Sequence, residues 1–578
     1  MPRPSLLSTV FSFALGVLLW IGLPSPAQGQ SLQDVVRYSA RSPAGGGPVA
    51  GRAGAGLSAG LAAPDALFRN PAGLGWLSSS MLSGDLATNV TQTDTRFVSP
   101  GPTGSADQTV SDYRLGSLAG AYSFPTTQGS LVIGVSVHQS NAYERGFDVP
   151  ATNGENSITE TFLPAEGDYE FDPDEGALFF DDNARLSQIA YEAGAIDFSR
   201  DRFDDGTRPF FFPGADPRDS TVADQLTLEQ QENLTESGQM NELSFGVGTA
   251  IAPNIMLGGG LNIAFGSYTF ERFYRETDVG NGQTNQVCSS PGLCPPADPA
   301  DPERPYDPYL ATDLNGDILL EGFDEMQLER RVDTDLAGVN FRIGLSAEPA
   351  EALRVGTHVS SPTWLNIDEV FGTEIRTFFD CDFSTGSCVR PEEPFSSGNL
   401  TGNEFSYDIR TPWRLGGGFQ YSLGSVALAG GATFIDWTQA EVSTEDGNSS
   451  NPNCSAQGLG PIEELNCDIQ GLDPTVNTRA GLEYETESFV LRTGVAYQPS
   501  PTDQSFQDID GTTADGDRLS LSAGASVSLG PSSTLHFNWL QERFDDRFVS
   551  YSSDRGTSPT VREALQRNRV LVGFTYRP

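Results

Sequence analysis

The feature that most constrains the fold is a series of segments, from about residue 77 to the C-terminus, in which apolar and polar residues alternate. In residues 131–138, four aliphatic side chains share one face, whereas glycine, serine and histidine share the other. A period of two indicates β-strands with one apolar face. About fourteen such segments follow one another, at residues 77–92, 110–124, 130–145, 238–252, 254–277, 325–347, 351–379, 403–422, 425–442, 475–486, 488–499, 516–529, 533–552 and 566–577.

The connections between these segments alternate between short turns and long loops. An even strand number with short turns at one end and long loops at the other predicts an all-β fold, a transmembrane antiparallel barrel of about 14 strands. A soluble propeller or tandem sandwich would show the same alternation, but with shorter strands of about five or six residues. Tryptophans near strand ends are expected in the interfacial girdles of such a barrel: Trp364, Trp413, Trp437 and Trp539.

The N-terminus has the pattern of a secretory signal. Arg3 precedes an apolar run from Leu6 to Leu23, and Ser25-Pro26-Ala27 is a small-residue cleavage site, so residues 1–29 are predicted to be a signal peptide. A membrane anchor is the alternative, although the run is short and ends at proline. No later apolar run is long enough for a spanning helix, so a mature chain in a membrane must span it as a barrel. The predicted location is the bacterial outer membrane.

The chain is strongly acidic. It has 77 acidic and 34 basic residues, a net charge of −43, and every basic residue is arginine. This charge repels phosphate backbones, which argues against nucleic-acid binding. Self-repelling carboxylates are tolerated where salt screens them, so a high-salt habitat is one interpretation of the composition.

The six cysteines occur in pairs within three successive long loops. Six cysteines allow fifteen connectivities, but proximity in the sequence favours three local disulfides, which suit an oxidising exterior. A zinc site is the weaker interpretation because no histidine lies near any pair. No metal or other cofactor is expected. The predicted pairs are Cys288 with Cys294, Cys381 with Cys388, and Cys454 with Cys467.

The sequence carries little sign of catalysis. The three histidines, at positions 138, 358 and 536, fall on the predicted lumen face. His358 shares that face with Ser360, as a strand-borne hydrolase pair would, but no carboxylate is placed to orient the imidazole. We therefore expect lumen-lining histidines, no catalytic residues and no enzymatic activity.

The longest predicted loop, about 146–237, is acidic. Clustered aspartates suggest calcium, and residues 313–317 place oxygen ligands at alternate positions, but Ile318 stands where an EF-hand requires glycine. Solvated acidic surface is the favoured interpretation. The aromatic cluster Phe210, Phe211 and Phe212 interrupts the acidic residues and is either packed on a neighbouring loop or an apolar landing site for substrate.

Residues 30–76, ahead of the barrel at 77–578, are small and apolar with closely spaced glycines, which favours a compact plug. Within them, Arg52–Gly56 and Asp65–Leu74 resemble the N-terminal hatch signature of the FadL/TodX family, outer-membrane transporters for long-chain fatty acids and other hydrophobic compounds. The resemblance continues through Ala121–Pro125, Asn241–Phe245 and Ser361–Trp364. It implies a fourteen-stranded barrel with a hatch in the lumen.

The resemblance also implies a function: passive uptake of long-chain fatty acids or other hydrophobic ligands by a monomer. Substrate would be captured among the loops, pass to a lumen pocket, and leave sideways into outer-membrane lipid at a kinked third strand. An alternative is a non-transporting barrel that acts as an attachment or shuttle partner for secreted proteins. The final residues, Tyr576-Arg577-Pro578, depart from the family's terminal aromatic.

Individual residues receive roles on this basis. The matched hatch residues are Asn70, Pro71, Ala72 and Gly73. Gly134 is the candidate weak point for lateral opening, because glycine tends to mark strand irregularities. The substrate-contact candidates are Phe68, Leu74, Trp76, Phe210, Phe211 and Phe212, with plug-to-wall packing as the alternative for the first three.

Overall fold

The computed structural model describes residues 31–578 with internal gaps. The gaps are residues 166, 173–176, 182–183, 200–207, 212–227, 280–309, 313–317, 383–395, 445–453, 455–459, 503–505, 508–512, 515 and 554–555. The predicted signal peptide and Phe212 therefore lie outside the described residues.

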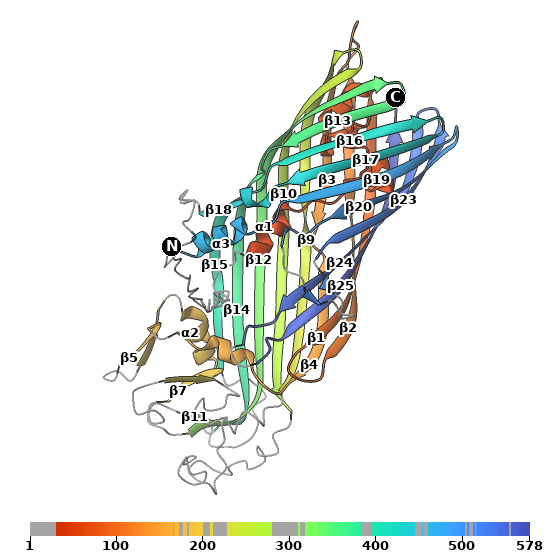
Figure 1. Ribbon diagram of the computed structural model, residues 1–578. Helices are drawn as coiled ribbons and strands as arrows, with labels where there is room; N and C mark the ends of the chain where they lie inside the picture. The colour runs from red at the N-terminus through yellow and green to blue at the C-terminus, as the bar shows by residue number, and fades with distance from the viewer. Residues whose placement is uncertain are drawn as a thin grey trace, which may run out of the picture.

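The chain forms a closed antiparallel barrel of fourteen strand positions, as the alternation predicts (Figure 1). The last strand pairs with the first along seventeen residue pairs, from Leu82 opposite Tyr576 to Val98 opposite Thr560, and so closes the barrel. The wall strands are β1 (Met81–Val98), β2 (Gly104–Ser123), β3 (Leu131–Ala142), β4 (Arg145–Asn153), β9 (Leu228–Ala252), β10 (Ile255–Asp278), β12 (Ile318–Ala350), β13 (Leu353–Ser360), β14 (Trp364–Asp382), β15 (Ser396–Arg410), β16 (Arg414–Leu423), β17 (Val426–Ile435), β18 (Glu441–Thr444), β19 (Thr475–Glu485), β20 (Phe489–Gln498), β23 (Arg518–Gly530), β24 (Ser533–Val549) and β25 (Thr560–Tyr576).

Four of the fourteen positions consist of two consecutive strands, which corrects the predicted boundaries. The predicted strand 351–379 is interrupted between β13 and β14, and 403–422 between β15 and β16. Each interruption contains a proline, Pro362 or Pro412, which lacks the N–H that a ladder requires. A 3₁₀ turn, η8 (Trp437–Gln439), separates β17 from β18. The third position divides into β3 and β4 at Tyr143 and Glu144.

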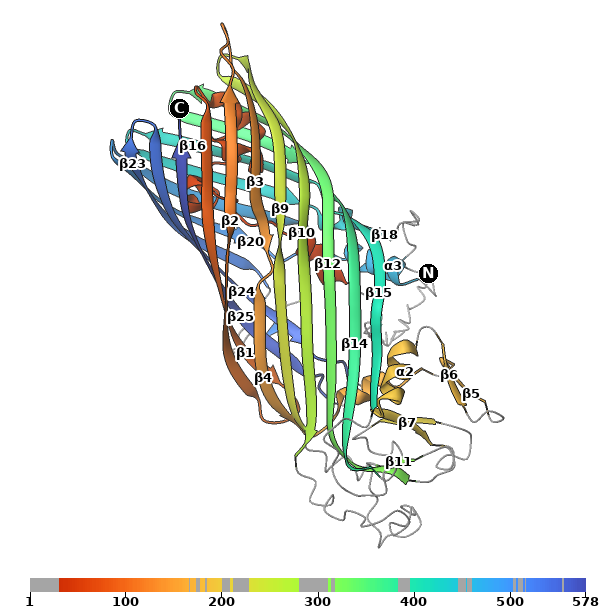
Figure 2. The same cartoon turned by 180° about the vertical axis from the view of Figure 1, so that it is seen from behind.

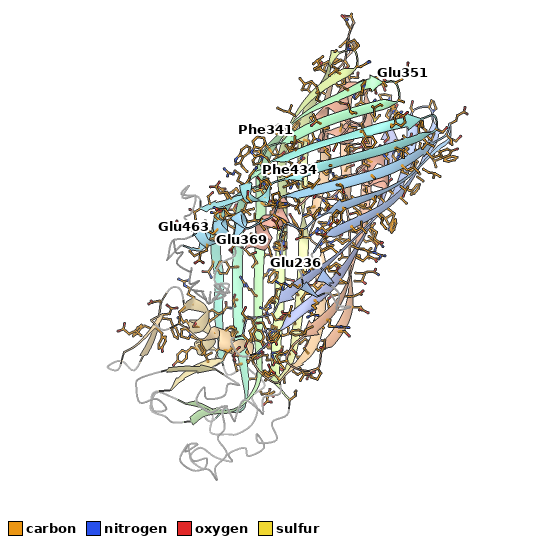
Figure 3. The ribbon with its side chains drawn as sticks, in the orientation of Figure 1. Glu236, Phe341, Glu351, Glu369, Phe434 and Glu463 are labelled. Atoms are coloured by element: carbon orange, nitrogen blue, oxygen red, sulfur yellow. A yellow bond between two sulfur atoms is a disulfide. The ribbon has the colours of Figure 1, made fainter. Side chains whose placement is uncertain are left out.

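A band of exposed apolar side chains surrounds the half of the barrel that has the short turns. On β10 the outward residues Leu257, Leu261, Ile263 and Phe265 are between 36 and 52% exposed. Phe341 and Phe434 belong to this half, and Glu236 and Glu369 to the long-loop half (Figure 3). A lipid-facing band of this kind, on a closed barrel, is the architecture of bacterial outer-membrane proteins.

None of the helices in the described ranges is long and apolar enough to cross a membrane.

The wall continues far beyond this band on the long-loop side. β9, β10 and β12 have 25, 24 and 33 residues, whereas a tilted strand crosses a bilayer with about ten. Toward the long loops their outward side chains become charged, as in the ion pair of Arg331 with Glu271. β10, β12 and β14 extend well past the ends of β16, β17 and β19 (Figures 1 and 2). The far half of the barrel therefore stands outside the membrane.

The long-loop end is filled by packed side chains. The predicted loop 146–237 is shorter than expected because β4 and β9 take both its ends, and between them it forms η4 (Ile158–Phe162), β5 (Tyr169–Asp172), β6 (Ala177–Phe180), α2 (Arg185–Glu192), β7 (Ile196–Ser199) and β8 (Arg208–Phe211). Phe162 and Ile189 from this loop are buried against Phe147 and Tyr274 of the wall. Other loops contain β11 (Leu310–Thr312), α3 (Pro461–Gln470), β21 (Phe506–Gln507) and β22 (Thr513–Ala514).

The N-terminal segment, residues 31–77, lies inside the barrel (Figures 1 and 2). Its elements are α1 (Leu32–Ser39), η1 (Pro48–Arg52), η2 (Pro64–Phe68) and η3 (Pro71–Trp76). η1 contacts β19, β20, β23 and β24, whereas η3 contacts β3, β9, β10 and β12 on the opposite wall. Strands far apart around the barrel are therefore joined through this segment.

Candidate transport path through the barrel

Asn70 fixes the N-terminal segment to the wall. Its Oδ1 accepts a hydrogen bond from the Ala72 backbone N–H at 3.1 Å, which caps η3, and Pro71 is the first residue of that turn. Its Nδ2 donates to the carbonyl of Ser58 at 2.8 Å within the segment. Longer bonds reach wall carbonyls of β12 and β13, at Leu345 (3.2 Å) and Thr357 (3.4 Å). One side chain thus joins two parts of the segment to two strands.

Glycines on the wall allow this close approach. A Cβ on Gly344 would lie 1.9 Å from Asn70 Oδ1, and a Cβ on Gly258 would lie 2.3 Å from the Ala72 nitrogen. Gly73 faces inward, where a Cβ would lie 2.2 Å from the carbonyl oxygen of Leu61. The four residues of the hatch signature therefore meet at one contact between the segment and the wall.

The substrate-contact candidates of the N-terminal segment pack on protein. The Phe68 ring lies edge-on to His138, with 4.5 Å between centroids. Leu74 is fully buried and lies over Gly134, where an added Cβ would be 3.2 Å from its Cδ1. Trp76 Nε1 donates to Ser346 Oγ at 2.9 Å, and the Arg354 guanidinium stacks on its ring. The three residues therefore pack between the N-terminal segment and the barrel wall.

The aromatic loop cluster cannot be placed in the same way. Phe210 and Phe211 belong to β8, but their side chains, and all of Phe212, lie outside the described residues.

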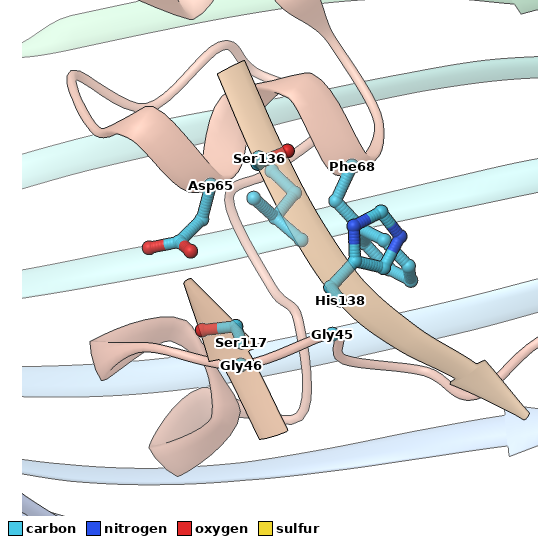
Figure 4. Close-up of a pocket in the computed structure, with 8 residues that line it drawn as sticks. Gly45, Gly46, Asp65, Phe68, Ser117, Ser136 and His138 are labelled. Carbon is cyan, nitrogen blue, oxygen red and sulfur yellow. The ribbon is translucent and has the colours of Figure 1, made fainter. Parts of the chain in front are cut away.

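A small cavity lies between the N-terminal segment and the third strand (Figure 4). Its volume is about 10 Å³, which holds about one water molecule. Phe68 and His138 lie together beside it, and Asp65 approaches it from η2 (Figure 4). It is lined by Gly45, Gly46, Leu57, Asp65, Phe68, Ser117, Ser136 and His138. An acyl chain or an aromatic ring cannot occupy this space unless the segment moves.

Asp65, one of the residues that line that cavity, is a buried acid. Its Oδ2 is buried and has no hydrogen-bond partner. Burial and, to a smaller extent, the negative charge of Asp85 raise the pKa of Asp65 to about 7. Asp85 instead accepts a hydrogen bond from the Gly47 backbone N–H at 2.7 Å. The two carboxyl groups therefore flank the same glycine-rich stretch of the segment.

The wall has a discontinuity at the third strand. β3 pairs with β2 only from Val132 to His138, and β4 pairs with β9 alone. The edge of β2 beyond Ser117 consequently lacks a ladder partner on this side. Gly134, the predicted weak point, lies instead in the regular part of β3, where it pairs with residues on both neighbouring strands. The third strand is interrupted at Tyr143 and Glu144, and the role of Gly134 in lateral opening stays a prediction.

Arg114 of β2 bridges this discontinuity. Its Nη1 donates to the Gly238 carbonyl of β9 at 3.0 Å, and its guanidinium also pairs with Glu144, at the break, and with Asp112. Tyr113 and Leu115, on either side of Arg114, are 82% and 48% exposed on the outer face. Arg114 therefore ties β2 to β9 and to the β3–β4 break where β2 and β4 share no ladder. Sequence reasoning missed Arg114 and Glu144, because nothing marks a lone charged residue in a polar strand as a bridge.

Other charged side chains line the lumen. Glu242 of β9 is buried and accepts a hydrogen bond from Arg342 Nη2 at 2.6 Å; Arg41 and His138 lie 3.4 and 3.6 Å from its oxygens.

The predicted lumen-facing position of the histidines is confirmed by their burial. His536 hydrogen-bonds Ser526 and Thr575. No group of three or more metal-ligating side chains gathers in the part of the chain that the structure describes.

The predicted local disulfide between Cys454 and Cys467 is formed, with Cα atoms 5.6 Å apart. For the other two pairs, Cys288, Cys294 and Cys388 lie outside the described residues, as does the side chain of Cys381.

Three of the four tryptophans predicted for the girdles, Trp364, Trp413 and Trp539, are 38 to 46% exposed. Trp437 is the exception: it is 5% exposed and donates to Thr475 Oγ1, because it sits in the turn between β17 and β18.

No protein-family model and no curated protein matches this sequence. Among solved structures, the barrel is similar to a Pseudomonas aeruginosa FadL homologue, with 14% identity and a TM-score of 0.48 over 93% of this chain and 99% of that one. It is also similar to two toluene transporters, each over 93% of this chain and 99% of that one: TodX of P. putida, with 11% identity and a TM-score of 0.45, and TbuX of Ralstonia pickettii, with 13% identity and a TM-score of 0.43. At these identities and TM-scores the likenesses carry no argument about substrate.

Proposed function

We propose that this protein is an outer-membrane channel for the passive uptake of hydrophobic compounds, long-chain fatty acids among them, and that residues 30–76 are its hatch. The observation that supports the proposal is the missing ladder between β2 and β4, which lies beside the exposed apolar side chains of Tyr113 and Leu115 on the outer face. A substrate leaving there enters lipid directly. Burial of each methylene group away from water is worth about 0.8 kcal/mol. A lateral route keeps the acyl chain out of the periplasmic water, so this free energy is not lost.

The proposed cycle has two barriers. Substrate entering from the loops meets the N-terminal segment, which leaves room for about one water molecule beside Phe68. Displacement of that segment opens the way to the third strand. There the Arg114 bridge must release Glu144 and the Gly238 carbonyl before β2 and the β3–β4 break can separate. The hatch and the bridge act in series.

A reversible lock tests the hatch. Ser58 lies on the N-terminal segment, and a Cβ placed on Gly431 of β17 would be 3.5 Å from the Ser58 Cβ, which is within disulfide range. The double variant Ser58→Cys/Gly431→Cys should carry labelled oleate or toluene into lipid vesicles at the wild-type rate when reduced and several-fold more slowly when oxidised. The two single-cysteine variants are the matched controls. Equal rates in the oxidised and reduced double variant would reject a mobile hatch.

A further inference from the structure

The small cavity beside Phe68 is lined by polar atoms that have no partner in the protein. Asp65, from η2, and Ser136, from β3, both line it and are 7 and 4% exposed. Neither Asp65 Oδ2 nor Ser136 Oγ forms a hydrogen bond within the described ranges. Buried polar atoms without partners are costly, so a cavity that they line favours a small polar ligand.

Further oxygen atoms converge on the glycine-rich stretch that borders this cavity. A Cβ on Gly47 would lie 2.3 Å from Asp65 Oδ2. A Cβ on Gly46 would lie 2.5 Å from Ser117 Oγ and 2.8 Å from Asp85 Oδ2. Asp65, Ser117 and Gly46 lie on the same side of the cavity (Figure 4). Carboxylate and hydroxyl oxygens are the ligands that hard cations such as sodium prefer, and here they come from both the N-terminal segment and the wall.

Asp65 has no counter-charge. Other buried carboxylates of the lumen each form an ion pair with an arginine: Glu236, Glu242 and Glu563. Asp65 forms none among the residues that the structure describes, and the titratable groups that face it are Asp85 from β1 and His138 from β3. Asp85 accepts hydrogen bonds from the Gly47 N–H and the Ser117 hydroxyl. An ionised Asp65 therefore leaves one uncompensated negative charge at the cavity.

We propose that this cavity binds one sodium ion, held by the Asp65 carboxylate and the hydroxyls of Ser117 and Ser136, and that the ion fixes the hatch against the wall. The volume, about that of one water molecule, admits a single ion without its hydration shell. A water molecule would occupy the same space but leave the charge of Asp65 unbalanced. The proposal goes beyond uptake, because it names a regulator of the hatch, and it rests on the assignment of residues 30–76 as that hatch.

Displacement of the hatch would break the site. Asp65 moves with the N-terminal segment, whereas Ser117 and Ser136 stay in the wall, so the ion must leave when the hatch does. Binding to the docked state alone lowers the ratio of displaced to docked hatch about tenfold for each tenfold rise in sodium above the dissociation constant. Deprotonation of Asp65 then favours displacement only where sodium is absent, because the ion replaces the proton.

Hydrogen–deuterium exchange of residues 44–58 tests the site on the purified full-length protein and does not depend on transport. Sodium chloride replaces choline chloride at constant ionic strength, which holds screening fixed. At about pH 8, where Asp65 is ionised, exchange should slow about tenfold for each tenfold rise in sodium. At about pH 5, after correction for the intrinsic rate, sodium should have no effect, because a proton occupies Asp65.

Variants assign the effect to the cavity. Asp65→Asn should abolish the sodium dependence, and Ser136→Ala, which removes one ligand but no charge, should require about tenfold more sodium. Asp34→Asn is the matched control. Asp34 is a buried acid of the same segment, but Arg37 and Ser31 already bind it, so the sodium dependence should persist. Ser136→Ala carries the test if Asp65→Asn does not fold.

Three results would overturn the sodium site. They are exchange that is independent of sodium at about pH 8, as a water-filled cavity would give; the same sodium dependence in Asp65→Asn as in the wild type; and protection by calcium chloride but not by sodium chloride. Vesicle uptake of oleate or toluene together with sodium-independent exchange would reject the site alone. Sodium-dependent exchange without any uptake would reject the transport function alone.

Discussion

The hatch proposal gives its sharpest prediction at Asn70. In Asn70→Ala the Ala72 N–H loses its cap and the Ser58 carbonyl loses a 2.8 Å hydrogen bond, together with the two longer bonds to the wall. We take about 1 kcal/mol for the cap and about 2 kcal/mol for the buried donor contacts. The docked hatch is then weakened by about 3 kcal/mol, which raises the ratio of displaced to docked hatch roughly 150-fold.

Single-channel recording in planar bilayers measures that ratio as the fraction of time in a conducting state. Asn70→Asp separates the two contributions, because it keeps the oxygen that caps Ala72 but turns the donor into an oxygen facing three carbonyls. It should open the channel at least as much as Asn70→Ala. Asn466→Ala is the matched control, since Asn466 also bonds backbone groups, those of Val442, but in a loop outside the hatch. Wild-type closure in a folded Asn70→Ala barrel would refute the assignment of Asn70.

Three further outcomes are expected. Arg114→Gln and Glu144→Gln should each speed oleate transfer to lipid several-fold, because both release the bridge across the wall; a slower transfer would show that the bridge guides exit and does not restrain it. The pKa of Asp65 is about 7 in the docked hatch and would return to about 4 once the hatch is displaced, so deprotonation of Asp65 favours displacement. Hatch closure should therefore weaken as pH rises from about 4 to 7 and then level off. The conductance of Asp65→Asn should be low and independent of pH across that window. Reduction of the Cys454–Cys467 disulfide, which spans 13 residues, should expose its loop to protease with little change in barrel melting, and protection equal to that of the oxidised form would count against its stiffening role.

The wall could be predicted from the sequence because each strand contacts lipid on one face and lumen on the other, a condition that every second residue must meet. Strand interruptions were less visible. Pro362 and Pro412 were present in the sequence, but apolar alternation continues on both sides of them, so each pair of strands reads as one. The break at Tyr143 and Glu144 contains neither proline nor glycine, so no residue type marks it in the sequence.

At the candidate site, contacts between residues close in sequence were easier to predict than contacts between residues far apart. The Cys454–Cys467 disulfide joins residues close in sequence, and their spacing indicated it. The motif singled out Asn70, but not the cap that its side chain forms. The Arg114 bridge and the hydrogen bond from Arg414 to the Ser39 carbonyl join residues separated by tens to hundreds of positions. Such contacts depend on barrel register and on the path of the N-terminal segment. No residue pattern predicts them, so the charged contacts of the lumen can be identified only from the fold.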